Sequence, residues 1–225
     1  GVELLLRCHY QDEWISPADF IPVLEEMRHI IEITRVATTQ AVNDMKQWYA
    51  QGFKGYVSIN LSALHFKTHF DLDLIEQLLR DAGLPNSSIR FEITEGVLID
   101  QSDEVLNQLT RIRDAGFKLA LDDFGTGYSS LSYLKRFPLQ ILKIDKSFID
   151  DIQESKEENA LVQTTINLAL SLKMDCIAEG IEHSEQVQYL LNQGCVRLQG
   201  YYFSKPVDAI TVAPLLLKQW REPSD

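Results

Sequence analysis

Phe117-Lys118-Leu119-Ala120-Leu121-Asp122-Asp123-Phe124-Gly125-Thr126-Gly127-Tyr128-Ser129-Ser130 is the stretch around which the chain is organised. Its first part, residues 117–121, is mostly apolar and predicts a buried strand. Asp122 and Asp123 end this strand with two adjacent carboxylates, and a loop with two glycines follows. A buried carboxylate costs free energy unless a positive group lies beside it. The stretch therefore predicts a strand end that binds a cation and forms the centre of an active site.

Length and composition set the first limits on the function. The chain has 225 residues, of which 45% are hydrophobic, enough for one large domain with a full core. The net charge of −12 argues against a DNA or RNA polymer as partner, because such binding needs a basic face. Cys8, Cys176 and Cys195 are scattered, and we interpret them as reduced thiols of a cytoplasmic domain. No apolar run reaches transmembrane length, while membrane attachment through an upstream region of the full-length protein is left open.

Short apolar strands alternate with helices along the chain. Strands are predicted at residues 4–10, 56–60, 89–94, 117–123, 139–145, 175–179 and 196–203. Helices are predicted from Ser16 and at about 31–50, 73–82, 102–115, 130–136, 158–172, 184–192 and 210–220. This alternation is typical of βα units and a parallel sheet. The predicted fold class is α/β, a (β/α)8 TIM-like barrel with one strand missing from this chain; an open doubly wound sheet is the alternative.

Polar residues stand where the predicted strands end. Reactive groups gather at the carboxyl ends of parallel strands in both candidate folds. Each such residue taken alone is more often a cap or a solvated strand end, but nearly every strand of this chain has one. They are Asn60, Glu92, Asp122, Asp123, Lys143, Asp145, Glu179 and Gln199, while Glu3 and Arg7 flank the first strand and are expected on one face of it.

The balance of charge at these strand ends indicates a metal centre. Five carboxylates are expected to converge against Lys143 and Arg7, so cations are needed to keep them ionised. Oxygen ligands suit Mg²⁺ or Mn²⁺ rather than structural zinc. His65 and His69 are interpreted as surface residues and not as ligands. Carboxylates around two divalent ions are typical of phosphoester hydrolysis.

Two basic residues have a role in this hypothesis and a simpler alternative. Lys143 would orient the water or offset phosphate charge; otherwise it is a buried lysine that neutralises Asp145. Arg7 would bind a phosphate oxygen; otherwise it forms a salt bridge at the rim of the barrel.

Motifs in a fixed order over all 225 residues resemble the EAL domain, the bacterial phosphodiesterase of cyclic diguanylate (c-di-GMP). The family's first motif stands here as Glu3-Leu4-Leu5-Leu6-Arg7, with Leu4 in place of alanine. The other matching segments are 16–22, 58–62, 91–95, 122–130, 142–148, 178–182 and 199–203.

The resemblance implies a role for each candidate residue. Glu3, Asn60, Glu92 and Asp122 would hold a first metal, and Asp122 with Asp123 a second. Glu179 would be the general base and would position the attacking water together with Lys143. Arg7, Asp145 and Gln199 would contact the substrate. Glu95 would brace the loop from Phe124 to Ser130, and Glu182 would support the Glu179 end.

The resemblance also implies cofactors and partners. Mg²⁺ or Mn²⁺, two per site, would support hydrolysis of c-di-GMP to linear pGpG, and Ca²⁺ would inhibit. A homodimer is expected, and the full-length protein has room for an upstream sensor or GGDEF domain. The missing strand would be the family's antiparallel first strand. The alternative function is a catalytically inactive c-di-GMP receptor, which is less favoured because every ligand position is filled.

Overall fold

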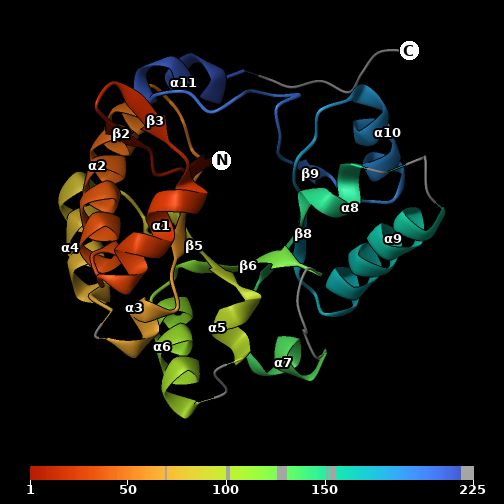
Figure 1. Ribbon diagram of the computed structural model, residues 1–225, viewed down its shortest axis with the longest axis horizontal. Coiled ribbons are helices and arrows are strands. Elements are labelled where there is room, and N and C mark those ends of the chain that lie inside the picture. The colour runs from red at the N-terminus through yellow and green to blue at the C-terminus, as the bar shows by residue number, and fades with distance from the viewer. Residues whose placement is uncertain (69, 100–101, 126–130, 151, 153–155, 219–225) are drawn as a thin grey trace. The chain divides into compact units, whose positions relative to one another are not determined.

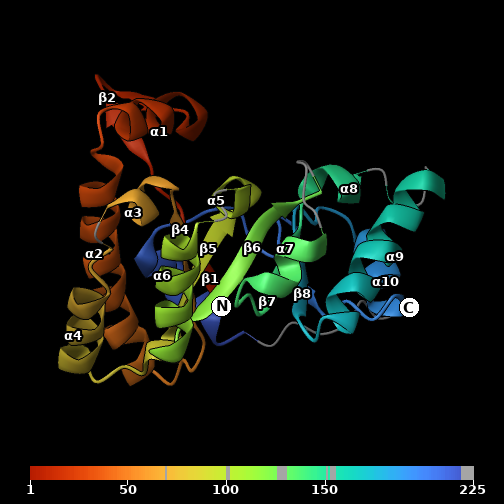
Figure 2. The same ribbon diagram turned by 90° about the horizontal axis from the view of Figure 1, so that it is seen from below.

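A computed structural model describes residues 1–68, 70–99, 102–125, 131–150, 152 and 156–218. The chain forms two compact units. Unit 1 comprises residues 1–93 and 100–118, and unit 2 comprises residues 94–99 and 119–225. Figures 1 and 2 show the elements of each unit, which are described in turn.

Unit 1 is built on three parallel strands in the order β1-β4-β5. Val2 pairs with Val57 and Val57 with Ile89, which places Glu3 opposite Ser58 and Asn60 opposite Glu92. The strands are β1 (Val2–Leu4), β4 (Val57–Leu61) and β5 (Ile89–Thr94). The helices are α1 (Pro17–Glu26), α2 (Ile30–Ala50), α3 (Leu64–Lys67), α4 (Leu72–Ala82), the 3₁₀ turn η1 (Asn86–Ser88) and α6 (Asp103–Asp114).

Local signals explain where these helices begin and end. The side chains of Ser16 and Ser102 accept hydrogen bonds from backbone N–H groups in the first turns of α1 and α6. Gly83 ends α4 in the left-handed conformation, at a φ of 71°. Helices α2 and α4 pack side by side (Figures 1 and 2). These helix limits agree with the predicted ones to within a residue or two.

The prediction of one strand over residues 4–10 is wrong. β1 ends at Leu4, and Cys8–Tyr10 forms β2, which pairs antiparallel with β3 (Glu13–Ile15) in a two-stranded hairpin. The turn residues Gln11 and Asp12 both have positive φ, and this tight turn directs the hairpin pairing. Arg7 therefore lies outside β1 and does not share a strand face with Glu3.

Unit 2 contains four strands in the order β6-β7-β8-β9, and each pairing between them is parallel. The strands are β6 (Lys118–Phe124), β7 (Ile141–Ile144), β8 (Asp175–Ala178) and β9 (Arg197–Leu198). The helices are α5 (Glu95–Ile99), α7 (Leu131–Arg136), α8 (Lys146–Asp150), α9 (Lys156–Ser171), α10 (Ser184–Asn192) and α11 (Ala209–Leu216). Ala120 of β6, Ile141 of β7 and Ile177 of β8 form a buried apolar cluster.

The predicted pattern of parallel strands and connecting helices is confirmed within each unit. β9 is shorter than predicted, and α9 begins at Lys156, two residues before its predicted start. The predicted helix at 210–220 is α11, which ends earlier than predicted, at Leu216. Residues 219 and 220 of the predicted helix and residues 126–130 of the central loop lie outside the described part of the chain. Within the described residues, no helix is long and apolar enough to cross a membrane. All three cysteines are free thiols.

His65 corrects a second prediction. Its side chain is buried, with 2% exposed, rather than on the surface. It lies in α3, and its ring contacts the ring of Phe70 edge to face. Burial lowers the pKa of the His65 imidazole, which favours the neutral ring. His69 lies outside the described residues.

Candidate metal centre and phosphoester site

Unit 1 brings three of the predicted residues together at the carboxyl ends of its strands. The Asn60 side-chain N–H donates to Glu3 Oε1 at 2.7 Å. Carboxylate oxygens of Glu3 and Glu92 lie within 4.8 Å of each other, and Glu92 is buried, with 2% exposed. The parallel register places Asn60 opposite Glu92, so a short run of strand is enough to assemble the group. We call Glu3, Asn60 and Glu92 the unit 1 cluster.

A β-bulge shapes the acidic end of β6. Leu121 pairs with Leu142 and Phe124 pairs with Ile144, so β6 has one residue more than β7 between these pairs. Asp123 has a φ of 53°, a conformation that non-glycine residues seldom adopt. Adjacent side chains of a regular strand point to opposite faces, and a bulge redirects them. As a result, carboxylate oxygens of Asp122, Asp123 and Glu179 all lie within 4.8 Å of one another.

Lys143 supplies the positive charge in this part of the site. Its side chain is almost completely buried, with 1% exposed, and Nζ lies 3.0 Å from Asp122 Oδ1 and 2.8 Å from Glu179 Oε1. A buried ammonium is stable only with such partners. Asp122, Asp123, Lys143 and Glu179 are called the unit 2 cluster. Lys143 thus forms ion pairs with Asp122 and Glu179, and its catalytic role stays a prediction.

The three predicted substrate contacts have defined local surroundings. Asp145 Oδ1 accepts from the backbone N–H and the hydroxyl of Ser147, at 3.0 and 2.5 Å, and so orders the start of α8. Gln199 follows β9, where its backbone N–H donates to Ala178 and its carbonyl accepts from Ile181. The exposed Arg7 guanidinium donates to the Leu6 carbonyl at 2.8 Å.

The two predicted bracing residues differ in what they contact: Glu95 contacts the chain at Gly125, and Glu182 contacts Lys146 of α8. Glu95 is buried in α5, and its Oε1 accepts from the Gly125 backbone N–H at 2.8 Å. Gly125 is the last described residue before 126–130, so Glu95 touches the start of the predicted loop. Glu182 Oε1 accepts from Lys146 Nζ at 2.5 Å. This bond lowers the pKa of Glu182 and raises the pKa of Lys146.

Lys146 and Gln186 were missed at the sequence level. Lys146 begins α8, after β7, and its Nζ contacts Glu182, after β8; Gln186 joins α10 to both of these segments. The sequence signal available for Gln186 was its place two residues into α10, where glutamine serves in a capping box. Nothing in the periodicity of the chain marks Lys146.

The donor atoms of both clusters fit a hard divalent cation. Carboxylate oxygens and an asparagine amide are the ligands that Mg²⁺ and Mn²⁺ prefer. Asn60 donates through its nitrogen to Glu3, which leaves the amide oxygen as its ligand atom. The two described groups of acidic residues with oxygens this close together contain no cysteine or histidine, in keeping with oxygen ligation.

Parallel strands that end in carboxylates, an amide and a buried lysine define an α/β protein with a candidate metal centre. A family model described as "EAL domain" matches residues 1–206. The chain therefore belongs to the EAL domain family.

Similar proteins agree with this assignment. MucR of Pseudomonas aeruginosa, a bifunctional diguanylate cyclase and cyclic di-GMP phosphodiesterase, is 35% identical over 211 residues, covering 93% of this chain and 31% of MucR. The signaling protein YkoW of Bacillus subtilis is 36% identical over 220 residues, covering 97% of this chain and 28% of YkoW. The chain thus spans roughly a third or less of the length of these curated relatives.

Solved structures confirm the fold class. The MucR phosphodiesterase in complex with c-di-GMP matches with a TM-score of 0.87 and 33% identity, over 93% of this chain and 86% of the solved one. The EAL enzyme Bd1971, with cAMP and cyclic-di-GMP bound, matches with a TM-score of 0.88 and 34% identity, over 95% of this chain and 59% of that one. The predicted barrel-type α/β fold is therefore confirmed, and the doubly wound alternative is not supported.

Proposed function

We propose that this chain is a metal-dependent phosphodiesterase that hydrolyses c-di-GMP to linear pGpG. The observation that carries the proposal is the unit 2 cluster, in which a buried lysine lies between two carboxylates beside a third. A degenerate, purely receptor domain has no need of such a group. The family assignment and the c-di-GMP bound to MucR and Bd1971 supply the substrate class.

In this proposal the carboxylates and Asn60 are the metal ligands. Glu3, Asn60, Glu92 and Asp122 would hold one Mg²⁺ or Mn²⁺, and Asp122 and Asp123 would hold a second. When bound, such ions would supply activation of water and stabilisation of the attacking and leaving oxygens.

Glu179 is proposed as the general base of the reaction. Its carboxylate takes the proton of the attacking water, while Lys143 holds Glu179 in place through their 2.8 Å contact. Arg7 and Gln199 bind and orient the dinucleotide, and Asp145 contributes the oxygen that Ser147 leaves available. Charge-assisted contacts to phosphate of this kind favour arginine at the Arg7 position.

The arrangement of the whole protein is also proposed. We expect residues 1–225 to act as one EAL phosphodiesterase domain, cytoplasmic and homodimeric, within a longer protein that has room for a sensor or a GGDEF domain. MucR provides the precedent for joining the two activities in one chain.

The deciding experiment is to incubate the protein with c-di-GMP, with and without Mg²⁺ or Mn²⁺, and to follow pGpG by chromatography. Metal-dependent product is the expected result. Excess Ca²⁺ should suppress it, because a larger ion with looser geometry positions water poorly. Binding of c-di-GMP without product would replace this proposal with the receptor function, and neither binding nor product would contradict both.

A further inference from the structure

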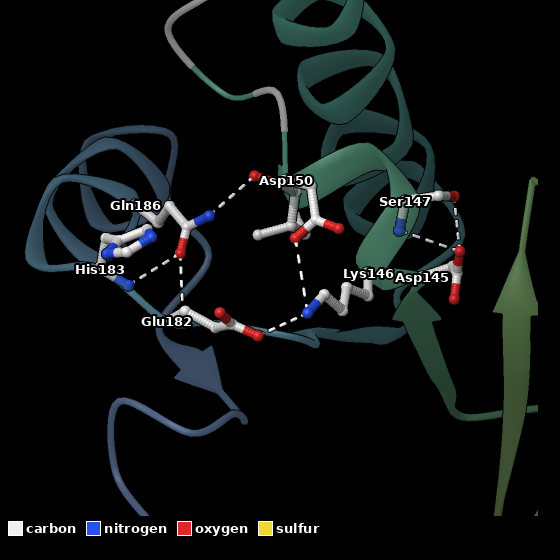
Figure 3. Close-up of polar contacts among 8 residues, drawn as sticks. Asp145, Lys146, Ser147, Asp150, Glu182, His183 and Gln186 are labelled. Atoms are coloured by element: carbon white, nitrogen blue, oxygen red, sulfur yellow. Dashed lines mark hydrogen bonds and ion pairs between the residues drawn. The ribbon is translucent and has the colours of Figure 1, made fainter.

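The side chain of Gln186 is a buried hydrogen-bonding junction in unit 2 (Figure 3). Gln186 is 5% exposed, and its Oε1 accepts from the backbone N–H groups of Glu182 and His183, at 2.8 and 3.0 Å. Its Nε2 donates to the carbonyl of Ile149 at 3.0 Å. A single amide therefore joins three segments: α10, the chain after β8 and the helix α8.

Helix capping alone does not explain a glutamine at this position. In a capping box, glutamate and glutamine serve equally, since only an acceptor for the N-cap N–H is required. The carbonyl of Ile149, however, needs a donor, which an ionised glutamate lacks. The Ile149 carbonyl also accepts from the Ile152 backbone N–H at 3.2 Å, so a carboxylate at this place would remove one of its two bonds and set oxygen against oxygen.

The segments joined by Gln186 carry the proposed reacting groups. Glu182 lies three residues after Glu179. Helix α8 begins directly after Asp145, and Asp145 follows β7, the strand that carries Lys143. The Glu179 backbone N–H also donates to the Ile144 carbonyl at 3.1 Å. Gln186 thus holds the chain after Glu179 to the chain after Lys143.

The segment after β8 and the helix α8 are also closely packed against each other. Gly180 has a φ of 69°, and a Cβ at this position would lie 2.3 to 2.8 Å from the side-chain carbons of Lys146. The Lys146 chain therefore lies directly on the Gly180 backbone. A small movement of α8 relative to this backbone would displace Glu179, the residue that precedes Gly180.

A second link between these segments is exposed. Lys146 Nζ lies 2.5 Å from Glu182 and 3.8 Å from Asp150, and the three side chains are between 37% and 49% exposed. Figure 3 shows this ion pair beside the Gln186 amide. Exposed ion pairs contribute little because water and salt screen them. The buried amide is therefore the link that fixes the geometry.

We propose that Gln186 is a positioning residue for the hydrolysis, acting through the 179–183 segment to hold Glu179 against Lys143. This inference rests on the proposed phosphodiesterase function. Gln186 touches neither substrate nor metal ligand in this assignment. Its loss should therefore lower kcat and leave KM for c-di-GMP nearly unchanged.

The test compares Gln186→Glu with Gln188→Glu, the same change on the exposed face of the same helix. Gln186→Glu keeps both acceptor bonds and loses only the donor to Ile149. We expect kcat with saturating Mg²⁺ to fall about 10- to 100-fold, the usual cost of displacing a reacting group, with KM within about twofold. Gln188→Glu should match the wild type.

A further comparison separates the two links. Lys146→Met keeps an unbranched chain over Gly180 but removes the charge, and it should change kcat less than about twofold, because exposed ion pairs are weak. If Lys146→Met lowers kcat as much as Gln186→Glu does, the assignment to Gln186 is overturned.

Hydrogen exchange supplies a readout that does not depend on turnover. Measured by mass spectrometry on the peptide spanning residues 180–183, exchange should be faster in Gln186→Glu than in Gln188→Glu. Wild-type kcat or wild-type exchange in Gln186→Glu would refute the proposal. If that variant fails to fold by circular dichroism, Gln186→Met, which buries no charge, takes its place with the same expected results.

Failure of the proposed function would be recognised separately. A wild-type protein without turnover refutes the phosphodiesterase function, and the exchange measurement then decides on its own whether Gln186 holds this segment.

Discussion

In unit 1 the carboxylate of Glu3 accepts from the neutral amide of Asn60, whereas in unit 2 the ammonium of Lys143 lies between Asp122 and Glu179. An amide orders a carboxylate without cancelling its charge, while a buried ammonium both orders the carboxylate and cancels its charge. The unit 1 cluster should therefore depend on added cations more than the unit 2 cluster does. The unit 2 cluster is held in place by its own lysine, an arrangement that suits the proton transfer proposed for Glu179.

The largest expected effect lies in the unit 2 cluster. Glu179→Gln keeps the shape of the side chain but removes the proton acceptor, and kcat should fall about 1,000-fold, within the range for a general base. Metal binding, measured by calorimetry, should be changed far less than turnover. Glu185→Gln, an exposed glutamate on α10, is the matched control, and equal turnover in both variants would show that Glu179 is not the base.

Removal of the lysine tests the charge balance of the same cluster. Lys143→Met leaves Asp122 and Glu179 beside each other without their shared cation. In metal-free buffer at neutral pH, we expect a loss of about 3 kcal/mol in the free energy of unfolding, as for other broken buried ion pairs. Urea denaturation measures this loss, and saturating Mg²⁺ should recover part of it. An unchanged midpoint would mean that Lys143 does not stabilise the cluster.

The unit 1 cluster is tested by metal dependence. Glu3→Ala removes the carboxylate that Asn60 orders, and the half-saturating Mg²⁺ concentration should rise at least about tenfold, comparable to losses seen around other metal sites. Turnover at ordinary Mg²⁺ concentrations should be abolished. Glu13→Ala, an exposed glutamate in the β2–β3 hairpin, is the control. An unaltered Mg²⁺ titration would exclude Glu3 as a ligand.

The smallest expected effect is the contribution of His65, in unit 1, to the pH dependence of stability. Burial lowers the pKa of His65 in the folded chain below the ordinary 6.5, so the unfolded chain binds a proton first as pH falls. The resulting stability is fully present above pH 6.5 and is lost below it. His65→Phe should flatten the dependence of the unfolding midpoint on pH between 7 and 5, as measured by urea denaturation at a series of pH values.

Sequence reasoning succeeded where a local pattern dictates structure. Serine caps and Gly83 marked the helix ends, and short apolar runs marked the strands. Because parallel strands align their carboxyl ends, the positions of Asn60 and Glu92 followed from the strands alone.

Other features depend on contacts between distant segments and were not visible in the pattern. The β2–β3 hairpin interrupts an apolar run that reads as one strand, so Arg7 was misplaced. His65 looks like an ordinary surface residue until α3 folds it inward. The role of Gln186 depends on the carbonyl of Ile149, 37 residues away, which no local spacing reveals.

The bulge in β6 has a consequence for how this site is encoded. In a regular strand, Asp122 and Asp123 would face opposite sides, and only one carboxylate would be available at the strand end. One additional residue in β6, with Asp123 in the left-handed conformation, makes both carboxylates available at the strand end. In the proposed two-ion site, the binding of the second ion would then depend on chain length as much as on side-chain chemistry. A single-residue deletion at this point would convert the two-carboxylate strand end into a one-carboxylate end while leaving every other ligand unchanged.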